Sequence, residues 1–180
     1  KNFKEPTFDS LVSSSKPFGL RTYVSGEVEK TSKNNIILYG NKVKNYININ
    51  DLKSNIQWIN QYKVYITYAY GAGEDFPHQI INKPFLGEPG SACTETYLVV
   101  SPSDSKEICL NVISYMATKF FRFMVLLLKN TQHATKSVYQ LTPIQDFSRP
   151  WSDVDLYKKY RLSQEEIDFI ESMIRPMELD

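Results

Sequence analysis

The stretch from residue 105 to residue 129 is the feature that most constrains how this chain folds. Apolar side chains recur through it at helical spacing, at positions 108, 109, 112, 113, 116, 120, 123, 124 and 127. They cover more than one face of a helix, which is typical of an element buried on several sides. Asp104 and Glu107 have the spacing of a capping box, so we predict one long central helix ending near Lys129. Phe120→Ala is then expected to cost about 3–5 kcal/mol.

Short segments rich in β-branched and aromatic residues surround this helix. The pair 36–39 and 43–49, separated by Gly40-Asn41, predicts a hairpin. Further strands are predicted at 18–25, 63–70, 97–100 and 137–141, and a helix of about three turns at 51–62. Short strands with one long helix favour an α+β fold, with a twisted mixed or antiparallel sheet, a central long helix and a C-terminal helical tail.

The last thirty residues differ from the rest in charge. Residues 151–180 hold eight acids and four bases, a net charge of −4, so residues 1–150 carry +5 of the total of +1. Ser163 and Glu166 form a capping box before Ile167 and Ile170. We therefore predict a main domain at 1–150 and a C-terminal helical extension at 151–180 that packs on protein. A basic body with an acidic tail is compatible with nucleic-acid binding.

No catalytic motif emerges from the sequence. Gly71-Ala-Gly73 lacks the third glycine of a dinucleotide loop. Asp51-Leu-Lys53 and Asp104-Ser-Lys106 match one piece of a nuclease site, but both lie where helix starts are predicted. His78 and His133 have no activated nucleophile to pair with. We expect no catalytic residue, metal or cofactor site in these residues.

The cysteines and the most apolar segment bear on where the protein is located. Cys93 and Cys109 suit neither a disulfide framework nor a metal set, which favours a reducing cytoplasm. The most apolar run, 120–128, is interrupted by Arg122 and is too short to cross a bilayer. We therefore expect a cytoplasmic protein with no membrane partner.

Three polar loops carry the positive signal for nucleic acid: 21–35, 68–91 and 129–136. The 71–92 segment within them is long and broken by Gly and Pro, as functional loops often are. Arg reads guanine edges, Asn and Gln read adenine, and Lys, Ser and Thr hold phosphates. Solvated loops are rich in the same residue types, so that reading stays open. The candidate DNA-binding residues are Arg21, Lys33, Asn34, Tyr70, Ser91, Lys129, Thr131, Gln132, His133 and Lys136.

Three segments of the sequence are specific enough to indicate a family. FFRFMVLLLKNTQ, PIQDFSRPW and SQEEIDFIESMIRPM resemble the C-terminal target-recognition region of bacterial type II restriction–modification adenine-specific DNA methyltransferases, of the γ class that methylates N6. The resemblance is strongest from residue 63 onward. The order of parts is also similar to recognition domains of type I specificity subunits, with Gly90-Ser91, Thr131-Gln132 and Pro143-Ile144 in the corresponding places.

The resemblance implies that different parts of the parent enzyme bind the cofactor and select the DNA site. In such enzymes an N-terminal part binds S-adenosylmethionine and flips the adenine, while the C-terminal domain selects the site. These 180 residues lack the Asn/Asp-Pro-Pro-aromatic motif, so the cofactor is implied for another part of the parent enzyme. Whether an endonuclease is fused to that parent or paired with it stays open. The implied partners are double-stranded DNA and the methyltransferase core. The alternative is a scaffold or subunit-interface domain that binds no DNA.

Overall fold

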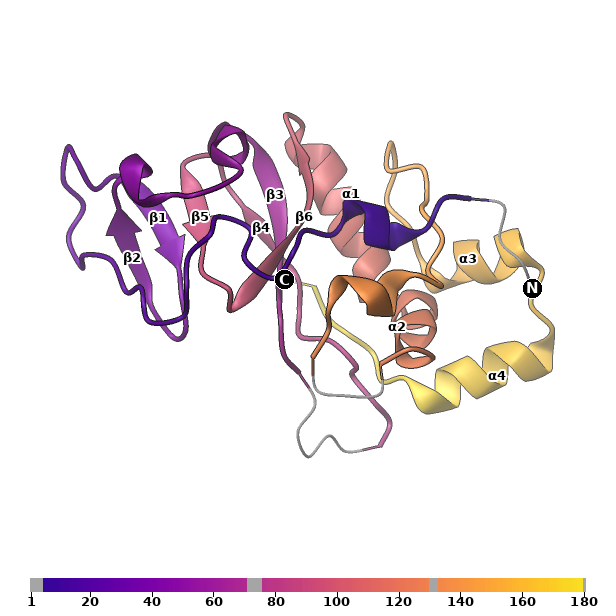
Figure 1. Cartoon of the computed structure of the whole chain (residues 1–180). Helices are drawn as coiled ribbons and strands as arrows, with labels where there is room; N and C mark the ends of the chain where they lie inside the picture. Colours follow the sequence, from indigo (N-terminus) through magenta and orange to yellow (C-terminus); the bar gives the residue numbers. More distant parts are fainter. Residues whose placement is uncertain (1–4, 71–75, 130–132, 180) are drawn as a thin grey trace.

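The α+β class is confirmed by a computed structural model, which describes residues 5–70, 76–129 and 133–179 (Figure 1). Strands gather at one end of the molecule and helices at the other. The strands are β1 (Ile36–Tyr39), β2 (Lys44–Ile47), β3 (Tyr62–Thr67), β4 (Phe85–Gly87), β5 (Ser91–Cys93) and β6 (Tyr97–Ser103). The α-helices are α1 (Lys106–Ala117), α2 (Lys119–Leu126), α3 (Asp153–Tyr160) and α4 (Gln164–Met173). Short 3-10 helices are η1 (Phe8–Leu11), η2 (Ile49–Asp51), η3 (Ile56–Asn60) and η4 (Lys136–Tyr139).

The strands form two small sheets where the sequence predicted one. The first has the order β2-β1-β5, with β1 antiparallel to β2 and parallel to β5. The second has the order β4-β3-β6 and is wholly antiparallel. The predicted hairpin is confirmed by the pairing of Ile36 with Ile47 and of Tyr39 with Lys44.

Strand β3 supplies side chains to two separate hydrophobic clusters. Val64 and Ile66 point to the cluster built with α1 and α2, whereas Tyr65 points to the cluster between the sheets. The same division holds in β6, where Leu98 and Val100 face the helices and Val99 faces the other way. Alternation follows from the pleat of a strand, and burial on both faces explains why β3 is so apolar.

The predicted long helix is wrong in one respect, because it is broken into α1 and α2 with a bend of 64°. Thr118 has an extended backbone at the break, and its side chain accepts a hydrogen bond from the Phe121 N–H. Asp153 completes the cap from α3, because its carboxylate accepts the N–H groups of Lys119 and Phe120 at 3.0 and 2.8 Å. The start of α1 is also shifted, since Ser105 caps it in place of Asp104.

Asp153→Ala should therefore destabilise the fold by about 1–3 kcal/mol, because two helix N–H groups lose their acceptor in a half-buried place. Urea unfolding measures the change in the free energy of unfolding. Asp168→Ala is the matched control, since Asp168 is exposed on α4 and accepts a hydrogen bond from the Gln164 side chain, away from any helix N–H cap. Equal stabilities of the Asp153→Ala variant and the wild type would refute the cap.

Other local predictions are also corrected. Residues 18–25 form turns because their main-chain groups pair with residues outside any strand: the Lys53 N–H donates to the Phe18 carbonyl, and the Glu95 N–H donates to the Leu20 carbonyl. The 51–62 helix is interrupted because Asn55 is left-handed, with φ of 53°. Residues 137–141 lie mostly in η4, while the long 71–92 segment contains β4 and β5.

The C-terminal helices pack on the main body. The capping box of Ser163 and Glu166 is confirmed at the start of α4, and Ser152 with Asp155 forms another at α3. Leu156, Ile170 and Ile174 lie in the same cluster as α1 and α2. The domain boundary predicted at residue 150 stays a prediction.

In the described residues no single helix has the length and hydropathy to span a bilayer, although α1 and α2 together pass that test.

Candidate nucleic-acid interface

A rigid turn at residues 16–22 positions the first candidate residue, Arg21. The Lys53 N–H binds the carbonyl of Phe18, and the side chains of Ser54 and Asn55 bind the carbonyl of Pro17. Gly19 has φ of 75°, and a Cβ there would lie 2.5 Å from the Cβ of Lys53. A glycine is therefore required at that position, and the turn projects Arg21 in a fixed direction.

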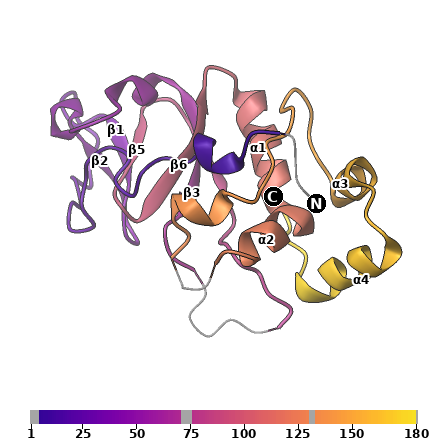
Figure 2. The ribbon, with the colours of Figure 1, turned by 45° about the vertical axis from the view of Figure 1, so that its right-hand side comes forward.

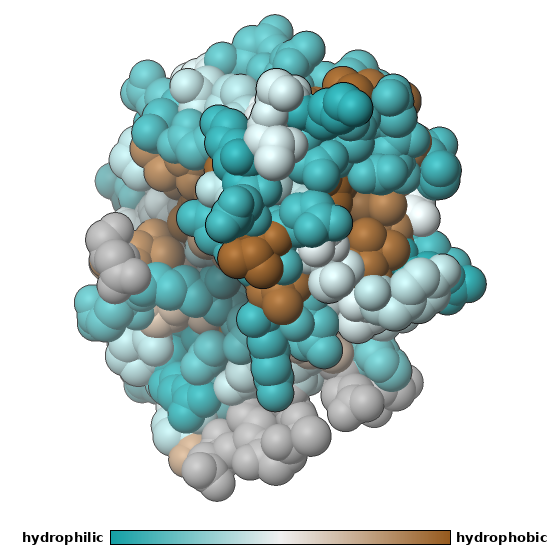
Figure 3. Space-filling view, turned by 90° about the vertical axis from the view of Figure 1, so that its left-hand side faces the viewer, coloured by the Kyte–Doolittle hydropathy of each residue, from teal (hydrophilic) through white to brown (hydrophobic). Residues whose placement is uncertain are grey.

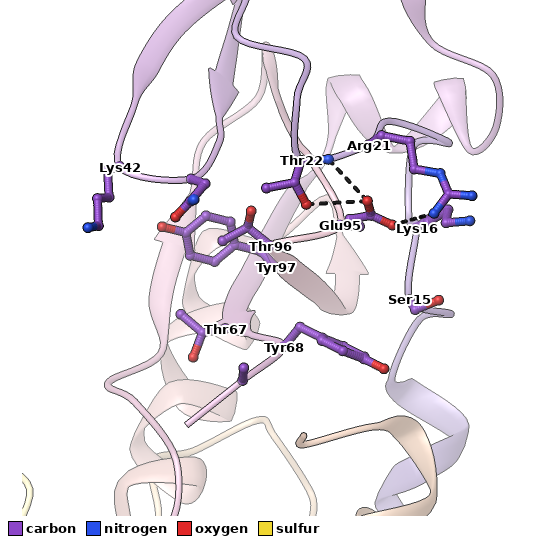
Figure 4. A pocket seen from close by; sticks show the side chains of 12 residues that line it. Ser15, Lys16, Arg21, Thr22, Lys42, Thr67, Tyr68, Glu95, Thr96 and Tyr97 are labelled. Carbon is purple, nitrogen blue, oxygen red and sulfur yellow. Dashed lines mark hydrogen bonds and ion pairs between the residues drawn. The ribbon is translucent and has the colours of Figure 1, made fainter. Parts of the chain in front are cut away.

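Arg21 lies on the wall of a cleft of about 830 Å3 between the two sheets (Figure 4). Lys16, Arg21 and Thr22 come from the N-terminal turn, and Asn41 and Lys42 from the β1–β2 turn. In Figure 4, Lys42 lies on the opposite side of the view from Lys16 and Arg21, with the rings of Tyr97 and Tyr68 between them. The remaining wall consists of Ser15, Thr67, Ala69, Glu95 and Thr96.

Glu95 organises the basic side of the cleft. Its carboxylate accepts the N–H and hydroxyl of Thr22 at 3.1 and 3.2 Å, and it pairs with Arg21 at 3.5 Å. Partial burial works to raise the pKa of the Glu95 carboxyl, but the Thr22 hydrogen bonds and the charges of Arg21 and Lys16 outweigh it and lower that pKa. Three cations thus share the cleft with one ionised carboxylate.

The charge extends beyond the cleft. Residues 16–44 contain six Lys or Arg and two Glu, a net charge of +4. Figure 3 views this end of the molecule and shows a largely hydrophilic surface with small hydrophobic groups. A concave basic site within a polar surface is the arrangement expected of a phosphate-binding face.

The second and third candidate loops lie beside each other. Ala69 bridges His133, the Ala134 N–H donates to the Tyr68 carbonyl at 2.8 Å, and the rings of Tyr68 and His133 are 5.1 Å apart. Tyr68 also lines the cleft, so it connects exposed His133 to the Arg21 wall. The structure thus brings parts of all three predicted loops together.

Tyr70 and Lys129 form a further link between the second and third loops. The Lys129 ammonium donates to the Tyr70 carbonyl at 2.8 Å and lies 5.8 Å from its ring centre. Arg175 donates to the Tyr70 hydroxyl at 3.0 Å. These contacts hold the two loops together, while the predicted contacts of Tyr70 and Lys129 with DNA stay predictions.

Three other described candidates, Lys33, Asn34 and Lys136, lie outside the lining of the cleft. Lys33 and Asn34 precede β1, whereas Asn41 and Lys42 follow it, so they are separated by the four residues of the strand, roughly 13 Å. Lys136 is exposed on η4. Thr131 and Gln132 lie outside the described residues.

The prediction that Ser91 contacts DNA is wrong, because Ser91 is fully buried in β5 and DNA cannot reach its side chain. Its hydroxyl and carbonyl accept from the ammonium of Lys63 at 3.4 and 3.2 Å, and its hydroxyl lies 3.2 Å from that of Tyr65. Lys63 is also fully buried, and it donates to the Glu88 carbonyl as well. The cluster joins β3 to the β4–β5 turn and is structural.

Burial lowers the pKa of Lys63 to about 8 from its ordinary 10.5. Between pH 7 and pH 9 the folded protein therefore releases a proton that the unfolded chain keeps, so this group alone should raise stability with pH by about 1 kcal/mol. Burial raises the pKa of Cys93 and Cys109, so near pH 9 the unfolded chain loses thiol protons that the folded protein keeps, which lowers stability. Lys63→Met retains both thiols, so urea unfolding at both pH values should show wild-type stability rising by about 1 kcal/mol relative to that of Lys63→Met. The same change with pH in both proteins would contradict the assignment.

The sequence prediction missed Lys16, Lys42 and Glu95. Lys42 follows the Gly40-Asn41 turn and has φ of 61°, so a turn could be predicted here. Nothing local in the sequence indicates that Lys42 lies across the cleft from Arg21. Glu95 lies 74 positions from Arg21, and no local pattern joins them.

Comparisons with family models, curated proteins and solved structures found no match to this chain. Within the described ranges no group of three His, Cys, Asp or Glu side chains has the arrangement of a metal site.

Proposed function

We propose that this chain recognises a sequence in double-stranded DNA, as the target-recognition domain of a restriction–modification adenine methyltransferase. The observation that carries the proposal is the cleft in which Lys16, Arg21 and Lys42 surround partly exposed polar and aromatic groups. The resemblance of residues 63 onward to that enzyme family supplies the biological setting. The parent's S-adenosylmethionine-binding part would perform the methylation, and the free thiols of Cys93 and Cys109 suit a cytoplasmic location.

The side chains of the cleft divide by chemistry. Lys16 and Lys42 suit phosphates, because an ammonium is a point charge without a preferred plane. Arg21 presents a planar fork of donors, which matches the O6 and N7 acceptors of guanine. Asn41, on the β1–β2 turn, matches adenine in the same way. Phosphate contacts would fix the register of the duplex while Arg21 and Asn41 read base edges.

Selection from a pool of random duplexes tests the proposal without knowledge of the site. The chain is expected to enrich one short motif, and Arg21→Ala should relax the preference at one position by about 1–3 kcal/mol. The alternative, a scaffold domain, is favoured by apolar side chains exposed just after α2 and on α4. It predicts no retained duplex, and that result would refute the DNA proposal.

Glu95→Gln should strengthen binding to any duplex by up to about tenfold at low salt, because it removes the carboxylate that opposes phosphate. Gln keeps an oxygen to accept the Thr22 N–H, so the turn should survive. Fluorescence anisotropy with a labelled duplex measures the change. Glu88→Gln is the matched control, since Glu88 pairs with Lys106 away from the cleft. Unchanged or weaker binding by Glu95→Gln would place DNA elsewhere.

A further inference from the structure

An apolar groove of about 560 Å3 lies at the helical end of the molecule. Phe123 of α2, Leu127 just after α2, Leu141 after η4 and Phe169 of α4 line it. Leu127 is 52% exposed, Phe169 55% and Leu141 40%, although all three are large and apolar. A concave site lined by several exposed apolar side chains is typical of a protein-binding surface.

The edge of this groove is acidic. Helix α4 carries Glu165, Glu166, Asp168 and Glu171 and contains no Lys or Arg. Glu166 is itself part of the groove wall. Lys119 offsets Glu171 in an ion pair at the start of α2. Glu165 and Asp168 are exposed on the same helix, so α4 carries a net negative charge beside the groove.

The groove and the basic cleft lie at different ends of the fold. Figure 1 places α2 and α4 among the helices, away from β1 and β2, and Figure 2 keeps them beside each other after rotation. The ring of Phe123 contacts that of Phe169 at 5.8 Å, so the two helices form one surface. Phosphates would be repelled here, and a cationic protein segment would be attracted.

We propose that this groove binds an amphipathic α-helix of a protein partner, with an apolar face and a flank of Lys or Arg. Apolar side chains spaced three and four residues apart would enter beside Leu127 and Phe169, and the basic flank would face the carboxylates of α4. A second copy of this chain suits the groove poorly, because two such acidic surfaces would repel each other. The inference does not depend on DNA binding.

A synthetic peptide of Leu and Lys, forming an amphipathic helix of about five turns, serves as the probe. Fluorescence anisotropy with the full chain should show saturable binding of this peptide and much weaker binding of the same peptide with Glu in place of Lys. Leu127→Ser and Phe169→Ser should each weaken binding about tenfold, since each removes an apolar contact. Glu166→Gln should weaken it about threefold, because it removes charge from the wall but keeps an acceptor for the Ser163 N–H.

Val154→Ser is the matched control, because Val154 is 75% exposed on α3 and lies outside the groove. It should bind the Leu/Lys peptide as the wild type does. Circular dichroism confirms that each variant is folded. The proposal is overturned if the Glu peptide binds as tightly, or if Leu127→Ser and Phe169→Ser bind as the wild type does. Self-association of the free chain that Phe169→Ser abolishes would overturn it too, in favour of a second copy.

Discussion

Phe121→Ala should lower the free energy of unfolding by about 3–5 kcal/mol, the largest stability effect expected in this chain. Phe121 is fully buried in α2, and its ring meets those of Phe8 and Tyr115 edge to face at 4.9 and 5.0 Å. Its removal leaves a cavity among residues from η1, α1 and η4, which cannot close without moving several elements. Urea unfolding followed by circular dichroism measures the loss.

Phe120→Ala provides the comparison. Phe120 is also buried and stacks on Tyr160 at 5.1 Å, but it lines the apolar groove between α2 and α4. Water can enter the space that it leaves, so the cost should fall toward the lower end of the same range. A cost below about 1 kcal/mol for Phe121→Ala would contradict the packing described for α2.

Much of the fold was predictable because its signals are local. The alternation in β3 predicted a strand with Val64 and Ile66 on one side, and both face the helical cluster. Gly40-Asn41 predicted the β1–β2 hairpin, and Ser163 with Glu166 predicted the start of α4. Each of these signals lies within a few residues of the structure that it specifies.

The errors arose where distant residues decide the structure. The break between α1 and α2 depends on Asp153, which lies 34 positions from the Lys119 N–H that it accepts. Ser91 was predicted to contact DNA, but it is buried in β5. Its hydroxyl forms hydrogen bonds with Lys63 and Tyr65, which lie 28 and 26 positions away in the sequence. A buried Lys held by uncharged acceptors is unusual, and composition gives no sign of it.

The candidate interface was predictable only in part. Arg21 and the Tyr68 loop were chosen for their residue types, and both line the cleft. Lys16 and Lys42 were not chosen, because their proximity depends on how the N-terminal turn and the first sheet meet β6. The charge of a sequence segment can indicate that it forms a basic surface. Which of its cations lie around one cleft depends on the tertiary fold.

Replacing Lys16, Arg21 and Lys42 together with Ala should weaken binding to any duplex roughly 100-fold near 0.1 M salt, because it removes the two phosphate contacts of Lys16 and Lys42. Each cation that meets a phosphate contributes about tenfold there through counterion release. Fluorescence anisotropy measures the dissociation constants, and thermal unfolding confirms that the variant is folded.

A charge-matched triple variant controls for the loss of net charge. Lys53, Lys106 and Lys158 are exposed and lie outside the cleft, so their replacement by Ala removes the same charge. It should weaken binding less than about tenfold. Equal losses in the two triple variants would mean that binding follows overall charge, and the cleft would have no special role.

The salt dependence of duplex binding tests the central proposal most directly. The logarithm of the association constant, measured between about 50 and 200 mM salt, should fall linearly with the logarithm of salt concentration. Two phosphate contacts, from Lys16 and Lys42, predict a slope of about −1.8 for the wild-type chain and a slope near zero once Lys16, Arg21 and Lys42 are replaced. Absence of duplex binding at 50 mM salt, or the same slope in that variant, would contradict recognition of DNA through this cleft.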